Sequence, residues 1–291
     1  MGPEQLVNIL IVGLRLSVIY SLMAIGFTLV YGVGKVFNYA HGAFFMWGAY
    51  IAWFLSTGFF HLSYPIAFII TIPIMFFFGV IFERIVIYPL RGRPRGVINI
   101  FIVTLGAALF LDNLALVSAG PFRKTLPPLL EGTLNLGVFV VSRHDVILLI
   151  IAIAVIIMLG LFLGKTREGT AMRAVSQSMV AAQIVGVPID RVFSYTFGIA
   201  AILAGISGML LAPRTLIFPG VGWPIFIKAF IIVVFGGLGS IKGSFWAAFI
   251  LGMIEAFIAF FIGGVWGLPV FSIVFLIVLV VRPQGLFGTV G

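Results

Sequence analysis

The chain has 291 residues, of which 62% are hydrophobic and 9% are charged, and its formal net charge is +9. Soluble domains carry roughly 25% charged residues, so this composition excludes a water-soluble globular protein. Apolar runs of about 18 residues or more match the thickness of a bilayer and are too long for tilted β-strands. The sequence therefore predicts an all-α, polytopic helical membrane protein, whose positive charge reflects short basic loops and not nucleic-acid binding.

The first predicted span covers residues 6–30 and carries Arg15, about 14 Å inside the membrane at the rise of an α-helix. The preceding residues lack a basic region, which predicts a retained first helix and not a cleaved signal. A polar, glycine-rich break follows at 31–42. A short span at 43–55 and a third span at 64–86 come next.

The next segments fix the predicted orientation. Loop 88–95 is short and holds the densest basic cluster, so it should be cytoplasmic. Its arginines are Arg91, Arg93 and Arg95. A fourth span at 97–117 leads to the longest loop, 118–144, on the outer side. With this arrangement the N-terminus lies outside and the C-terminus is cytoplasmic.

A polar segment, 164–191, separates two uncharged runs, 146–163 and 192–212, which we interpret as the fifth and sixth spans. Residues 170–185 have a helix-forming composition, Gly186 and Pro188 should end that helix, and Asp190 is well placed to cap the next span. The segment is either a short surface helix that a partner can grip or a solvated linker.

Apolar segments at 225–235, 245–262 and 270–281 complete the chain and bring the predicted number of crossings to eight or nine. The whole chain, 1–291, is predicted to be a single transmembrane domain. The sixth span carries small residues at every fourth position, a pattern that lets another helix approach closely and predicts a central, packed span rather than a site. These residues are Ala200, Ala204, Gly208 and Ala212.

Two glycine-rich breaks, 30–44 and 234–245, share an aromatic-Gly start and a small-Phe end. They are either an internal repeat running in one direction or a chance likeness in a Gly- and Phe-rich chain. Broken helices at matching places point to a substrate route in transporters.

Charges within the hydrocarbon are costly and need a partner, so Arg15, Asp112 and Glu255 should face the interior of the bundle or a water-filled cavity. Our hypothesis is that Arg15 pairs with Glu255 or Asp112, in either a structural or a transport role. Further polar candidates for the route are Asn38, His41, Asn99 and Thr104.

Catalytic chemistry is absent from the pattern. There are no cysteines, and the three histidines lack the spacing of zinc ligands. Gly164-Lys165-Thr166 imitates the end of a phosphate-binding loop, but Leu159 occupies the position of the required glycine. We therefore expect no catalytic residue, no metal site and no ATP bound by this motif.

Five fragments in order resemble the LivH-type permease of branched-chain amino acid ABC importers. They cover 13–50, 83–94 (ERIVIYPLRGRP), 169–192 (GTAMRAVSQSMVAAQIVGVPIDRV), 235–252 (FGGLGSIKGSFWAAFILG) and 282–288 (RPQGLFG). The resemblance implies a multi-pass protein of a bacterial or archaeal cytoplasmic membrane. It also implies four partners, which are a second, LivM-type permease, two cytoplasmic ATPase subunits that hold ATP and Mg, and an extracytoplasmic substrate-binding protein.

In such importers a cytoplasmic helix docks on the ATPase, and the resemblance assigns that coupling role to about 165–191. The matching residues are Glu168, Gly169, Ala171, Met172, Arg173, Ala174 and Ala182. Residues 176–178 depart from the more acidic family pattern.

The implied substrate is a branched-chain amino acid, although similar permeases move urea, short amides or aromatic acids. Two other classes stay open on the residues alone. One is an ion-coupled secondary transporter that uses Asp112 or Glu255, and the other is a passive channel with the glycine breaks as pore elements.

Overall fold

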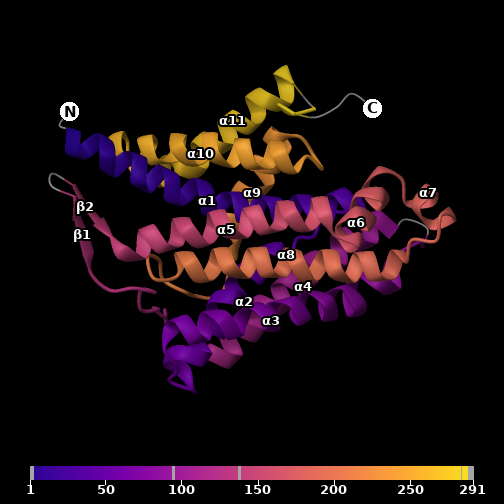
Figure 1. Cartoon of the computed structure of the whole chain (residues 1–291), viewed down its shortest axis with the longest axis horizontal. Coiled ribbons are helices and arrows are strands. Elements are labelled where there is room, and N and C mark those ends of the chain that lie inside the picture. The colour runs from indigo at the N-terminus through magenta and orange to yellow at the C-terminus, as the bar shows by residue number, and fades with distance from the viewer. Residues whose placement is uncertain (1–2, 94–95, 137–138, 283, 288–291) are drawn as a thin grey trace.

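The computed structural model describes residues 3–93, 96–136, 139–282 and 284–287, a bundle of helices with one small hairpin (Figure 1). Arg95, Pro283 and Gly288, which belong to the sequence patterns above, lie outside the described residues. The α-helices are α1 (Pro3–Gly34), α2 (His41–Trp53), α3 (Tyr64–Phe82), α4 (Gly96–Ala119), α5 (Arg143–Lys165), α6 (Arg167–Gln177), α7 (Met179–Ile184), α8 (Ile189–Leu211), α9 (Gly222–Gly236), α10 (Ile241–Phe261) and α11 (Gly267–Val281).

Short irregular helical turns extend three of these helices. π-helical turns follow α2 at Phe54–Gly58 and α3 at Glu83–Ile87, and a 3₁₀ turn continues α3 through Tyr88–Leu90. A second 3₁₀ turn, Gly264–Trp266, leads into α11. The strands β1 (Thr133–Leu136) and β2 (Phe139–Ser142) form an antiparallel hairpin in which Thr133 pairs with Ser142.

Seven helical segments in the described part of the chain are long and apolar enough to cross a membrane. Two further apolar helices, α2 and α9, are not among these seven segments. α2 has 13 residues and α9 has 15, and they correspond to the predicted segments 43–55 and 225–235. The all-α, polytopic prediction is confirmed, and the expected nine apolar segments are seven spans plus two short helices.

The ends of the bundle separate the loops into two groups. The N-terminus and the β1–β2 hairpin lie at one end, called here the hairpin end, whereas α6 and α7 lie at the opposite end, called the α6 end (Figure 1). The basic loop reaches the α6 end as well, because Arg91 bonds Asp190 at the start of α8. The predicted grouping of the basic loop with the polar segment is therefore correct.

α8 is the centre of the bundle. In α8, 83% of the most apolar 18-residue stretch is buried. In α5, which lies at the periphery, only 22% of the corresponding stretch is buried. The predicted stripe of small residues is buried, and at Gly208 an added Cβ would overlap the carbonyl oxygen of Phe45 on α2. Gly48 of α2 and Gly79 of α3 meet the α8 backbone equally closely. Glycine therefore sets how near α2 and α3 lie to α8.

The two short helices meet at glycines inside the bundle. His41 Nε2 lies 3.1 Å from the carbonyl oxygen of Met23, so α2 begins beside the middle of α1. A Cβ on Gly42 would lie 2.8 Å from the carbonyl oxygen of Gly222, the first residue of α9. From this crossing α2 runs to Trp53, beneath Lys124 near the hairpin end, whereas α9 runs toward the α6 end.

The two glycine breaks therefore have different settings. Residues 35–40 carry the chain from the end of α1 back into the bundle. Residues 237–240 form a tight turn between α9 and α10, in which Gly237 and Gly239 adopt φ of 102° and 84°. In the alignment of the two breaks, α1 corresponds to α9 and α2 corresponds to α10. The internal repeat stays a prediction.

Glycine packing on α8 makes a stability prediction. Gly208→Ala should lower the free energy of unfolding by about 1–3 kcal/mol, because the new methyl group overlaps the Phe45 backbone. Gly106→Ala on α4 is the matched control, since no atom lies within 4 Å of its added Cβ. Thermal unfolding in detergent measures both, and equal midpoints would contradict the packing argument.

Candidate translocation route and coupling segment

A polar line follows the buried face of α4. Toward the hairpin end, Trp223 Nε1 donates to Asp112 Oδ2 at 2.6 Å, which joins the start of α9 to α4. About two helical turns away along the same helix, the backbone N–H of Tyr39 donates to Thr104 Oγ1 at 3.3 Å. One turn further, Ile100 is part of the wall of a cleft at the α6 end. These three levels cover the part of α4 from Ile100 to Asp112.

The segment 35–40 crosses this line in the middle. Asn38 is fully buried, and its Oδ1 accepts from the backbone N–H of Ala40 at 3.1 Å. Its Nδ2 has no partner among the described residues, and neither has Nδ1 of the buried His41. Each unpaired buried polar atom costs about 1–3 kcal/mol. Two such atoms at the start of α2 identify a place where a polar ligand or water would be stabilised.

Aromatic rings close the route at that level. Tyr39 packs edge-on against Phe101 of α4, with ring centroids 4.6 Å apart, and against Phe226 of α9 at 5.3 Å. Phe27 of α1 contacts the same Phe226 at 5.6 Å. These rings fill the space beside segment 35–40. Of the predicted route residues, Thr104 and Asp112 lie on this line and Asn38 lies in the segment that crosses it. The His41 ring lies instead against Met23 and Gly26 of α1. Asn99, next to Ile100, is half-buried.

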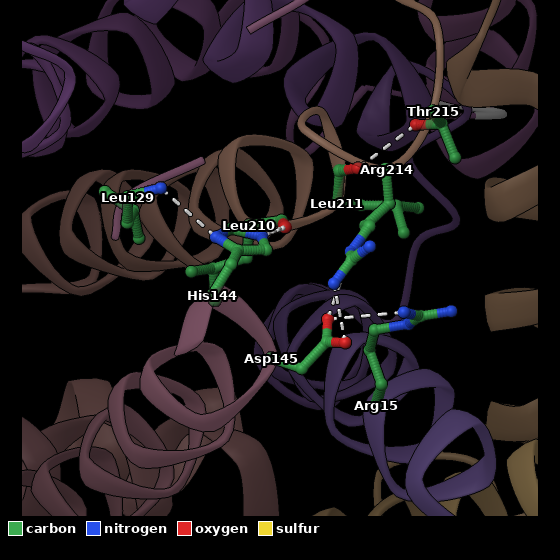
Figure 2. A network of polar contacts seen from close by, with 8 residues as sticks. All are labelled: Arg15, Leu129, His144, Asp145, Leu210, Leu211, Arg214 and Thr215. Carbon is green, nitrogen blue, oxygen red and sulfur yellow. Dashed lines mark hydrogen bonds and ion pairs between the residues drawn. The ribbon is translucent and has the colours of Figure 1, made fainter. Parts of the chain in front are cut away.

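Arg15 lies in a different network, at the hairpin end (Figure 2). Its Nη1 is 3.2 Å from Asp145 Oδ1, and Arg214 Nη2 is 2.7 Å from Asp145 Oδ2. The neighbouring His144 connects the loop to α8, since its Nδ1 accepts from the N–H of Leu129 and its Nε2 contacts the carbonyl oxygen of Leu210. The hypothesis that Arg15 pairs with Glu255 or Asp112 is wrong, because Arg15 forms its ion pair with Asp145 in the first turn of α5.

Glu255 has its own partners. Lys228 Nζ of α9 is 2.6 Å from Glu255 Oε1, and the hydroxyl of Tyr20 donates to Oε2 at 2.8 Å. Lys228 Nζ also lies 3.0 Å from the Tyr20 oxygen. This triad ties the short helix α9 to α1 and α10, and so positions α9 without lying on the α4 line. Sequence reasoning missed Lys228, although a lone lysine in an apolar segment is a detectable signal.

The polar segment folds as two helices, not one. α6 ends at Gln177, Ser178 has extended backbone angles, and α7 follows. Thr166 and Ser178 cap the two helices by accepting from the N–H groups of Gly169 and Ala181. The predicted stop at Gly186 is confirmed by its φ of 84°. The predicted cap by Asp190 is wrong, because Pro188 occupies the cap position and Asp190 bonds Arg91 instead.

The predicted coupling residues point in several directions. Gly169, Met172 and Ala182 are buried against the chain itself, and Gly169 lies against the carbonyl oxygen of Phe162. Glu168, Ala171 and Ala174 are half-buried, and Arg173 is exposed. An exposed apolar surface that sequence reasoning missed lies on and just after α7. It consists of Val180, Ile184 and Val185, which are 70%, 80% and 77% exposed.

Seven long apolar helices in the described part of the chain define a multi-pass membrane protein. The family model described as "Branched-chain amino acid transport system / permease component" matches residues 9–281. The chain belongs to this family, which is a family of transport permease subunits and not of enzymes.

Curated relatives align over nearly the whole chain. A high-affinity branched-chain amino acid transport system permease protein, BraD from Pseudomonas aeruginosa, is 34% identical and aligns over 98% of this chain and 95% of its own. LivH from Escherichia coli K12, of the same description, is 30% identical over 95% and 93%. A probable LivH permease from Methanocaldococcus jannaschii is 28% identical over 94% and 90%.

One solved structure shares the fold. PsaBC from Streptococcus pneumoniae in complex with Fab superposes with a TM-score of 0.52 and 12% identity, covering 96% of this chain and 94% of that chain. At this identity the likeness concerns the arrangement of helices alone.

The two charge networks predict a pattern of energetic coupling. Lys228→Met and Glu255→Gln should each lower the free energy of unfolding by about 3–5 kcal/mol, because each strands a buried charge, and the double variant should lose less than the sum. Arg15→Gln and Glu255→Gln share no partner and should add within about 0.5 kcal/mol. Chemical unfolding in detergent measures both cycles, and coupling between Arg15 and Glu255 would contradict the assignment.

Proposed function

We propose that this chain is the membrane-spanning permease subunit of an ATP-driven importer for branched-chain or similar small hydrophobic amino acids. The near-complete match to the family and the names of its relatives support the substrate class. The proposed partners are a LivM-type permease, two cytoplasmic ATPase subunits that hold ATP and Mg, and an extracytoplasmic binding protein. No ATP, metal or nucleic acid is assigned to this chain.

The proposal of ATP coupling rests on one observation, the exposed apolar surface formed by Val180, Ile184 and Val185. These residues lie outside the seven candidate spans of the described residues. Apolar side chains that project from a short helix are the usual anchors for a groove on a partner protein. We assign the α6 end to the cytoplasm, where the ATPase would supply that groove, and the N-terminus to the outside.

A displacement of this surface can be transmitted into the bundle through packed helices. α6 is seated on the end of α5 by the close contact of Gly169 with the backbone of Phe162. α7 is followed within a few residues by α8, the helix on which α2 and α3 pack. Closure of the ATPases would therefore move α8 and the two short helices together, and bias the bundle between two arrangements that expose the route to each side in turn.

α4 is the wall of the proposed route that can move. Only 28% of its most apolar window is buried, and Asp112 and Asn113 sit in its outer half. Asn113 is exposed, and a polar residue at this depth is stabilised by protein or water, not lipid. We therefore place the second permease against α4, where it would complete the route.

The alternative of an ion-coupled secondary transporter has weaker support. Glu255 is bonded by both Lys228 and Tyr20, and Asp112 by Trp223, so neither carboxylate is open to a passing ion in this arrangement. A passive channel has weaker support too, because aromatic rings close the route around Tyr39.

One charged substitution on α7 tests whether the ATPase docks there. Ile184→Asp should lower recovery of the ATPase subunits with the tagged chain, and lower ATP-dependent leucine uptake into proteoliposomes, by about tenfold or more, because a carboxylate would be buried in an apolar groove. Gln177→Asp, at an exposed polar position on α6, is the matched control and should retain both. Unchanged recovery of the ATPases with Ile184→Asp would refute this docking surface.

The composition of the complex tests the class of transporter. Affinity purification of the tagged chain from its native membranes should recover a second permease and two ATPases in stoichiometric amounts. Uptake should then require ATP and persist when ion gradients are collapsed. Recovery of the chain alone, with uptake that follows an ion gradient, would favour the secondary transporter.

A further inference from the structure

A cleft of about 690 Å³ opens at the α6 end between segments that are far apart in sequence. Its walls come from the end of α1 and the start of segment 35–40, the basic loop 88–93, the first turns of α4, and α7 with the start of α8. It lies at the foot of the α4 line, one helical turn from Thr104. A molecule in it would touch both the basic loop and the coupling segment.

The guanidinium of Arg91 is held rigidly in the wall of this cleft. Its carbon lies 4.2 Å from the ring centroid of Phe193 and 4.9 Å from that of Tyr88, so two aromatic faces fix its plane. Nη2 is 2.6 Å from Asp190 Oδ1 and 3.5 Å from Glu83 Oε1. Nη1 has no hydrogen-bond partner in the described part of the chain. A fixed cation with one unused donor is preorganised for a carboxylate.

Charges of both signs line the cleft. Asp190 is on its wall, bonded through Oδ1 alone, and its side chain remains 57% exposed, so it has room for another donor. Glu83 lies directly behind Arg91. Two carboxylates beside one arginine disfavour a free anion, while Arg91 and Arg93 disfavour a free cation. A ligand that carries one charge of each sign satisfies both groups.

The remaining walls are apolar. Val36 and Ile100 line the cleft together with Val97 and Met179, and Phe193 and Tyr88 supply aromatic faces. Burial of a branched aliphatic side chain against such residues is favourable by about 25 cal/mol per Å². The cleft thus pairs a zwitterion-binding edge with an apolar wall.

We propose that this cleft binds an α-amino acid with an apolar side chain from the α6 side of the membrane. The guanidinium of Arg91 binds the carboxylate, Asp190 binds the ammonium group, and the side chain lies against Val36, Ile100 and Phe193. Occupancy joins the basic loop to α7 and α8, so the transported product, as it accumulates inside, restrains the coupling segment and slows further uptake. The choice of ligand rests on the proposed function, but the site itself does not.

Binding is measured first, without transport, on the full chain in nanodiscs by isothermal titration calorimetry with leucine. Leucine should bind, whereas 4-methylpentanoate, which lacks the amino group, and isopentylamine, which lacks the carboxylate, should bind about tenfold or more weakly. Val97→Trp, which fills the cleft, should abolish leucine binding. Ile98→Trp is the matched control, because Val97 and Ile98 are 58% and 59% exposed and only Val97 lines the cleft.

Regulation is measured next, in proteoliposomes of the assembled importer with leucine enclosed on the ATPase side. Enclosed leucine should slow uptake by the parent protein and by Ile98→Trp, and should have no effect on Val97→Trp. Asp190→Asn, which keeps the side-chain shape, should weaken leucine binding about tenfold without affecting 4-methylpentanoate.

Each contrary result is distinct. Equal binding of leucine and 4-methylpentanoate, or displacement of leucine by inorganic phosphate, would identify an anion site and overturn the proposal. Loss of leucine binding in Ile98→Trp as well as Val97→Trp would also overturn it. Leucine binding to the chain without ATP-driven uptake would leave the site intact and refute the proposed function instead.

Discussion

Backbone contact through glycine is the constraint on which the rest of the bundle depends. Gly48, Gly79 and Gly208 let α2 and α3 touch α8 without intervening side chains, and Gly42 and Gly222 do the same where the two short helices cross. In lipid, where apolar side chains gain little by leaving their solvent, close packing of this kind is the main attraction between helices. The short helices hold their positions because α8 and this crossing hold them, not because they span the membrane.

The ion pairs lie at the ends and flanks of the bundle, around the central helix α8. Asp145 gathers two arginines at the hairpin end, Glu255 holds Lys228 beside α9, and Arg91 joins Asp190 at the α6 end. Each pair connects elements distant in sequence, so the ion pairs define which helices move as one body. α4 has none of these ion pairs, and only single hydrogen bonds such as that from Trp223 to Asp112 join it to the short helices.

Composition and periodicity predicted the class of fold, the number of apolar segments and the central position of α8, because these depend on local hydropathy and on small residues at regular spacing. They could not predict partners. Arg15 was paired with the wrong carboxylate because depth along a span says nothing of which helix lies alongside. The coupling residues were placed by family pattern, whereas exposure put Val180 and Ile184 outward and Met172 inward, an outcome decided by how α6 rests on α5. The break at Ser178 was missed because its extended angles arise from capping α7.

The pairing of Lys228 with Glu255 has a consequence for how the chain enters the membrane. α9 is 15 residues long and carries a lysine in its middle, and a lysine at the centre of a helix opposes insertion by about 2.5–3.5 kcal/mol. This cost is offset when Glu255 of α10, which lies 27 residues after Lys228, supplies the counter-charge. Insertion of α9 should therefore be more favourable once α10 has entered the membrane with it.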